Sequence, residues 1–96
     1  MINQLCKEAF NTAKSKGWHD EPRETGTMLA LIHSEVSEAL EADRKGDEEN
    51  LVEELADVCI RVFDFCGMNE YDLEHAILKK MEFNKYRPHR HGGKRY

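Results

Sequence analysis

Apolar side chains recur along this chain with the period of an α-helix, and no segment shows the alternation of a strand. The clearest case is the segment from Met28 to Ala42, where apolar residues return every three or four positions. Residues 3–16 carry a similar stripe, formed by Leu5, Cys6, Ala9, Phe10 and Ala13. Four such segments joined by short loops predict an all-α fold, a four-helix antiparallel bundle.

Glycine and proline bound the first two predicted helices. The first is expected over about residues 3–16, with Gly17 following its C-terminus. The second is expected to begin between Pro22 and Thr25 and to end at Gly46. A short loop therefore joins them.

The third and fourth predicted helices have acidic caps. Asp47 is placed as an N-cap residue, and the helix after it is expected to stop at Gly67. Asn69 or Asp72 is expected to cap the fourth helix, which fades near Pro88.

The third helix is apolar over more than half of its circumference. One stripe holds Leu51, Leu55, Val58, Val62 and Phe65, and the next holds Ala56, Cys59, Phe63 and Cys66. A helix of this kind is covered by neighbours on several sides. In so short a chain we expect some neighbours to come from another subunit, and we expect Cys59 and Cys66 to be core thiols rather than metal ligands.

Composition narrows the class of protein. The chain has 96 residues, 40% of them hydrophobic, which suits one small domain. No apolar run is long enough to span a membrane, and the charged start is unlike a secretory signal. Three cysteines, an odd number without framework spacing, favour a reducing cytoplasm.

Glu35 occupies an unusual position on the second predicted helix. At 100° per residue it falls in the middle of the apolar arc, between Met28, Leu31, Ile32 and Ala39. A charge on the core side of a helix is costly unless it is paired or bound to a metal. Two interpretations stay open: a metal site, or a buried salt bridge with Arg61.

Glu35 and Glu38 form one of two carboxylate pairs with three-residue spacing. Glu54 and Asp57 on the third helix form the other. Four carboxylates on two helices could gather around Mg²⁺, which prefers oxygen ligands, whereas zinc would want cysteine or histidine. The alternative is that the second pair belongs to an ordinary solvated face.

The same acids carry a resemblance to a known family. Glu35-Val-Ser-Glu38, fifteen residues, then Glu54-Leu-Ala-Asp57 is similar to the E-x-x-E…E-x-x-D signature of the MazG-like, all-α nucleoside triphosphate pyrophosphohydrolases. The flanking segments 31–40, 54–58 and 80–87 resemble the family too. The likeness extends from about Trp18 to Lys94.

This resemblance implies a function. It implies a single MazG-like helical domain over residues 1–96, with 89–96 as a basic tail, that assembles as a homo-oligomer, either a dimer or a tetramer. It implies hydrolysis of (deoxy)nucleoside triphosphates to the monophosphate and pyrophosphate with Mg²⁺, which Mn²⁺ could replace, for nucleotide-pool sanitation or balance. The metal ligands and catalytic residues would be Glu35, Glu38, Glu54 and Asp57.

Basic groups on the fourth helix are candidates for the substrate phosphates. Lys80, Asn84 and Arg87 share one face at i, i+4 and i+7. They resemble the family's basic stretch, which implies phosphate contacts for Lys80 and Arg87 and a ribose or phosphate contact for Asn84. The alternative is a solvated helix end whose cations face the last carbonyls.

Three further residues are candidate substrate contacts. Trp18, beside His19 in the loop before the second helix, could stack on a base or close the end of the bundle. Arg61 could hold the acids together or touch phosphate.

Two other functions compete with the enzyme. One is a catalytically silent oligomerisation or regulatory module that keeps the metal site, which the presence of all four acids and the basic face argues against. The other is a nucleic-acid-binding bundle that uses the basic tail. The net charge of −5, with an excess of basic over acidic residues only at the C-terminal end, argues against nucleic acid as a partner.

Overall fold

A computed structural model describes residues 1–88, which form four α-helices and no strand. They are α1 (Ile2–Ser15), α2 (Thr25–Arg44), α3 (Glu48–Met68) and α4 (Leu73–Lys85). The predicted all-α class with four helices is confirmed. Among these helices there is none with the length and apolar character that crossing a membrane requires.

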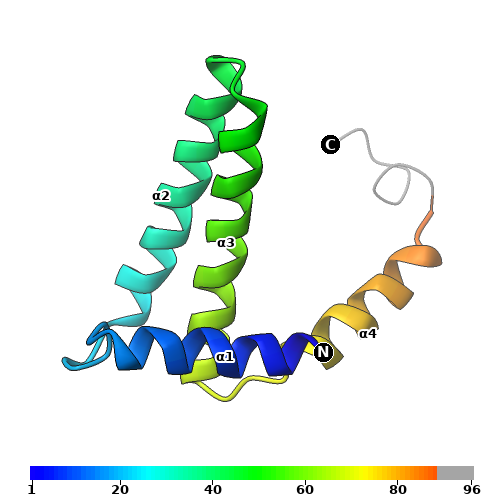
Figure 1. Ribbon diagram of the computed structural model, residues 1–96. Helices are drawn as coiled ribbons and strands as arrows, with labels where there is room; N and C mark the ends of the chain where they lie inside the picture. Colours follow the sequence, from blue (N-terminus) through cyan, green and yellow to red (C-terminus); the bar gives the residue numbers. More distant parts are fainter. Residues whose placement is uncertain (89–96) are drawn as a thin grey trace.

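The helices α2 and α3 form an antiparallel hairpin, which stands upright in Figure 1. Gly46 turns the chain between them with a positive φ of 71°. The Asp47 side chain then accepts a hydrogen bond of 3.0 Å from the Asn50 amide, which caps α3 as predicted. This hairpin carries both predicted acid pairs.

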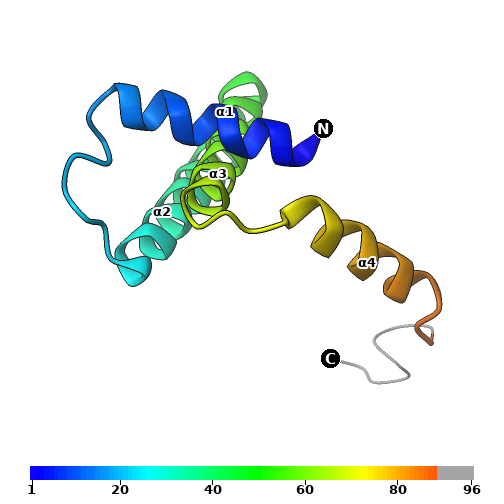
Figure 2. The ribbon, with the colours of Figure 1, turned by 90° about the horizontal axis from the view of Figure 1, so that it is seen from below.

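The helix α1 crosses one end of the hairpin and packs against α3 (Figures 1 and 2). Gly67 lies inside α3 at this crossing, so the prediction that it ends the helix was wrong. A Cβ atom there would lie 2.3 Å from the Cys6 carbonyl oxygen and 2.8 Å from the Phe10 Cβ. Gly67 is therefore needed for the close approach of α1. The chain turns instead at Glu70, whose φ is 56°.

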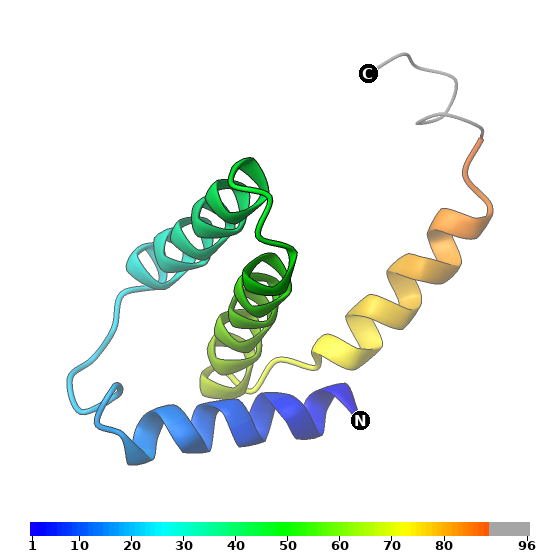
Figure 3. The same ribbon diagram turned by 45° about the horizontal axis from the view of Figure 1, so that its top comes forward.

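The helix α4 extends away from the hairpin, and its neighbour within the chain is the beginning of α1 (Figure 3). Asp72, one of the two predicted caps, accepts a hydrogen bond of 3.0 Å from the His75 amide at the start of α4. The antiparallel arrangement is thus carried by α2 and α3, with α1 across their end and α4 projecting outward.

The buried core of the chain is small. Its buried hydrophobic residues are Cys6, Ala13, Met28, Ala39, Ala42 and Cys66. Large apolar side chains are exposed on α2, α3 and α4, among them Leu29, Val36, Leu40, Val52, Leu55, Ile60, Leu78, Met81 and Phe83. Cys59 is also exposed, so the expectation that it lies in the core is wrong for the single chain. Much of the apolar surface of α3 is left uncovered.

Candidate metal centre

Three of the four predicted acids meet where α2 faces α3. Carboxylate oxygens of Glu35, Glu38 and Glu54 lie within 4.8 Å of one another. The three-residue spacing points Glu35 and Glu38 from one face of α2, and Glu54 reaches them from the neighbouring helix. Asp57, one turn further along α3, is exposed and lies outside this group of three, although its charge acts on Glu54.

Glu35 is buried and paired. The Arg61 Nε donates a hydrogen bond of 2.7 Å to its Oε1 atom. This hydrogen bond lowers the pKa of the Glu35 carboxyl, and burial opposes it only in part. The salt bridge that the sequence left open as an alternative is therefore present, and it lies beside the acid cluster rather than in place of it.

Glu54 is in the opposite electrostatic situation. A hydrogen bond shared with Glu38, then burial, then the charges of Glu38, Asp57 and Glu35 raise the pKa of its carboxyl to about 7. Its Oε2 atom is buried and has no hydrogen-bond partner among the residues that the structure describes. Buried oxygens are nearly always satisfied, so such an atom calls for a ligand or ion that supplies the missing interaction.

The chemistry of this group fits a hard divalent cation. All of its donor atoms are carboxylate oxygens, which Mg²⁺ and Mn²⁺ accept and which zinc sites seldom use alone. A cation would satisfy the buried Glu54 oxygen and neutralise the mutual repulsion of the carboxylates. The residues present therefore fit the metal that the acid spacing suggested.

Arg61 connects Trp18 to this acid cluster, since it contacts both the Trp18 ring and Glu35. The Arg61 guanidinium carbon is 6.0 Å from the centroid of the Trp18 ring, and Trp18 is 51% exposed. A groove of about 340 Å³ opens next to it between α1 and α3, and its lining includes Leu5, Ala9, Ile60 and Phe63. A flat aromatic ring thus borders an apolar groove, with Arg61 between the groove and the acids.

His19 occupies a different environment from its neighbour Trp18. Its Nε2 lies 2.7 Å from Asp64 Oδ1, and both side chains are only 8% exposed. The imidazole also meets the edge of the Phe10 ring, with centroids 5.0 Å apart. His19 therefore ties the loop that carries Trp18 to α3, and its ring is covered. Sequence reasoning gave Asp64 no role; its place three residues after Arg61 was the available signal.

The predicted phosphate-binding residues Lys80, Asn84 and Arg87, which we call the basic face of α4, are exposed. Lys80 and Arg87 cover the Phe83 ring at 5.0 and 6.0 Å from its centroid. Figure 3 shows α4 well apart from the α2–α3 hairpin, so one chain does not bring this face to the acids. The basic tail, residues 89–96, lies outside the described residues.

Comparison with protein families agrees with the class of protein that this helical, acid-lined site defines. The family described as the MazG nucleotide pyrophosphohydrolase domain matches residues 23–91, which include all four acids and the basic face. The chain belongs to this family, and so to a group of nucleotide-hydrolysing enzymes. Neither the curated proteins nor the solved structures gave a match.

Proposed function

We propose that this protein hydrolyses (deoxy)nucleoside triphosphates to the monophosphate and pyrophosphate in the presence of Mg²⁺. The observation that carries the proposal is the buried, unpartnered Glu54 oxygen among the carboxylates of Glu35 and Glu38. In a member of the MazG family, such a centre is suited to a cation that accompanies a polyphosphate.

The acid cluster would hold the metal. Glu35, Glu38 and Glu54 already converge, and Asp57 is close enough for its charge to act on Glu54. Bound Mg²⁺, or Mn²⁺ in its place, would offset the negative charge of the phosphates and increase the acidity of water. The pairing with Arg61 keeps Glu35 ionised and ready to bind.

Asp57 is the acid best placed to orient the attacking water. It is exposed, and it lies outside the group of three whose oxygens converge. A carboxylate so placed can accept the proton of the water as its oxygen bonds to phosphorus and the anhydride bond between monophosphate and pyrophosphate breaks, while the other three acids hold the metal. Its alternative role is that of a fourth ligand.

Trp18 and Arg61 are proposed to contact the nucleotide. The half-exposed Trp18 ring is suited to stacking on a base. Arg61 stands between Trp18 and Glu35, so its guanidinium can hold the empty site together and then turn toward a phosphate oxygen. We assign His19 to holding the Trp18 loop through Asp64.

The site would be completed by a second chain. The basic face of α4 lies apart from the acids of its own chain, and α4 also exposes Leu78, Met81 and Phe83. Packing such a helix against exposed apolar residues of α3, such as Val52 and Leu55, would bury both surfaces. We therefore propose a homo-oligomer, a dimer or tetramer, in which this face binds phosphate at a neighbouring acid centre.

The test is pyrophosphate release from a panel of standard and modified nucleoside triphosphates, with and without Mg²⁺. Release should require the metal and should be abolished by Glu38→Gln. The control is Glu41→Gln, one turn away on α2, where the exposed carboxylate pairs with Lys45 and Arg44. Loss in the first variant alone supports the proposal.

Two outcomes would contradict it. Release of single phosphate would mean that a different bond is cleaved. Absence of turnover across the panel, with the protein folded and the metal bound, would favour a catalytically silent regulatory module. An active enzyme with broad substrates fits a role in nucleotide-pool sanitation in the cytoplasm, the compartment that its three free cysteines favour.

A further inference from the structure

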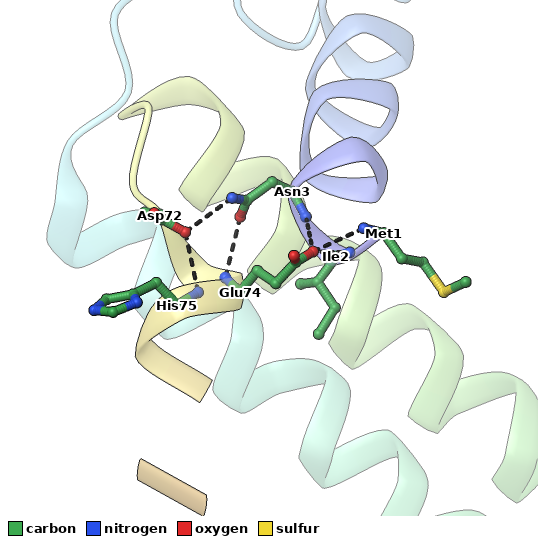
Figure 4. A network of polar contacts seen from close by, with 6 residues as sticks. All are labelled: Met1, Ile2, Asn3, Asp72, Glu74 and His75. Carbon is green, nitrogen blue, oxygen red and sulfur yellow. Dashed lines mark hydrogen bonds and ion pairs between the residues drawn. The ribbon is translucent and has the colours of Figure 1, made fainter. Parts of the chain in front are cut away.

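The N-termini of α1 and α4 meet in the fold although they lie about seventy residues apart in the chain (Figure 4). Each helix begins with amide groups that have no partner within the helix. In this junction, the side chains of one helix satisfy the amides of the other.

Glu74, in the first turn of α4, caps α1. Its Oε1 atom accepts hydrogen bonds from the Ile2 amide at 2.7 Å and from the Asn3 amide at 3.4 Å. It also lies 2.8 Å from the Met1 amino group. Met1 is 90% exposed, and such an exposed ion pair adds little by itself, so the contacts to the two amides carry the cap.

Asn3, in the first turn of α1, caps α4 in return. Its Oδ1 accepts a hydrogen bond of 3.1 Å from the Glu74 amide. Its Nδ2 donates a hydrogen bond of 2.8 Å to Asp72 Oδ1, the atom that also accepts from the His75 amide. Figure 4 shows the side chains of Asn3 and Glu74 crossing the junction in opposite directions.

The acids are needed because two helix N-termini carry partial positive charge and would repel each other. The hydrogen bond from the amino terminus, with those of the Ile2 and Asn3 amides, lowers the pKa of the Glu74 carboxyl. The Asn3 side chain and the His75 amide lower the pKa of the Asp72 carboxyl. Both carboxylates are therefore ionised at neutral pH.

Among residues 1–88, little else fixes the direction of α4. Its only residues that are not exposed are Leu73, Glu74 and Ile77, all in its first two turns. From Leu78 onward every described side chain is exposed. Within one chain, α4 is held at this end, so the junction sets the direction in which the rest of the helix is presented to a neighbouring subunit.

We propose that Asn3 and Glu74 are positioning residues for nucleotide binding: by capping each other's helices, they set the direction of the basic face of α4. This inference rests on the proposed function, in which that face binds phosphate. It assigns a role in substrate binding to two residues that lie outside the acid centre.

The structural half of the inference is tested by a distance measurement in the full-length protein with Mg²⁺. Spin labels at Asn11→Cys on α1 and Lys79→Cys on α4, in a Cys59→Ser background and diluted with unlabelled protein, report the direction of α4. Asn3→Ala and Glu74→Ala should broaden the distance distribution. Glu74→Gln keeps an oxygen that can accept from the amides, so it should restore most of the narrow distribution.

The functional half is tested by steady-state hydrolysis of the best nucleoside triphosphate. If fewer molecules hold α4 in the competent direction, apparent affinity falls by that fraction. Asn3→Ala and Glu74→Ala should raise KM about fivefold, the factor that corresponds to a lost cap of about 1 kcal/mol, with little change in kcat. Gln4→Ala and Glu82→Ala are matched controls, being exposed residues of the same two helices outside the junction.

The outcomes separate the two proposals. A broadened distribution together with a raised KM, both recovered in Glu74→Gln, supports the inference. An unchanged distribution, or a broadened one with unchanged KM in an active enzyme, overturns it. A wild-type protein that hydrolyses no nucleotide overturns the proposed function instead, and the distance measurement then still reports whether the junction directs α4.

Discussion

Arg61 on α3 and Glu35 on α2 are joined by a hydrogen bond of 2.7 Å directly beside two further carboxylates. This single guanidinium explains how a glutamate can lie on the apolar side of α2. It also leaves Glu38 and Glu54 without a comparable partner, because the Arg61 side chain is engaged by Glu35. The centre is thus electrostatically balanced at one carboxylate and unbalanced at the others.

Removing Arg61 should destabilise the metal-free protein. Arg61→Ala leaves Glu35 buried without a counter-charge, and we expect a loss of about 2 kcal/mol in the free energy of unfolding, less than for a fully buried pair. Urea denaturation in metal-free buffer measures it. Arg44→Ala removes an exposed arginine paired with Glu41 and should change stability by less than about 0.5 kcal/mol. An equal loss of stability in both variants would show that the Arg61–Glu35 pair contributes no more than an exposed ion pair.

The stability of the metal-free protein should depend on pH through Glu54. Folding raises its pKa from 4.5 to about 7, so the folded state binds the proton more tightly and the contribution to stability is lost as pH rises through this interval. The pH dependence that Glu35 contributes has the opposite sign. Folding lowers the pKa of Glu35, so its contribution to stability is lost as pH falls below about 4.5. Thermal unfolding between pH 3 and 8 measures both.

Glu54→Gln should remove the decline in stability between pH 4.5 and 7, because the amide cannot ionise. Glu53→Gln, the exposed neighbour on α3, should leave it intact. Mg²⁺ should also oppose the decline, since it competes with the proton for the same oxygens. A decline that persists in Glu54→Gln would place its origin elsewhere.

Asp57→Asn should separate metal binding from turnover. If Asp57 orients water, the variant keeps most of its stabilisation by Mg²⁺ while kcat falls by about 10²-fold or more. Calorimetric titration with Mg²⁺ and pyrophosphate release measure the two effects on the same sample. Loss of metal affinity in step with activity would make Asp57 a fourth ligand instead.

Gly67→Ala should disrupt the crossing of α1 and α3. The new Cβ would meet the Cys6 carbonyl oxygen at 2.3 Å, so the backbones must separate, and we expect a loss of about 3 kcal/mol. Gly26→Ala is the matched control because nothing lies within 4 Å of its Cβ position in α2. It should be neutral or stabilising by up to about 1 kcal/mol. Denaturant unfolding of both variants would decide, and a mild Gly67→Ala would contradict the close packing.

Features that depend on neighbours in the chain could be predicted from the sequence. The helical period gave the four helices, and short-range capping chemistry identified Asp47 and Asp72. Glu35 was recognisable because a single charge interrupted an apolar stripe. These signals depend on residues close together in the sequence, so they do not depend on how the helices pack.

Other features that depend on distant contacts could not be predicted. Gly67 has the residue type of a helix stop, but the approach of Cys6 from α1 decides its role. From the sequence His19 was a candidate substrate contact, but in the fold its ring is covered and paired with Asp64 of α3. Helical spacing placed Lys80 and Arg87 on one face, yet it carried no information about where α4 points.

The separation of the basic face from the acids within one chain has a consequence for genetics. Suppose that, in the proposed homo-oligomer, one chain lacks Glu38 and another lacks Arg87, so that each variant alone is inactive. Mixed oligomers would join the intact acids of one chain to the intact α4 of the other and rebuild working sites. Two defective alleles would then complement each other when expressed together, a behaviour that a site contained within one chain could not produce.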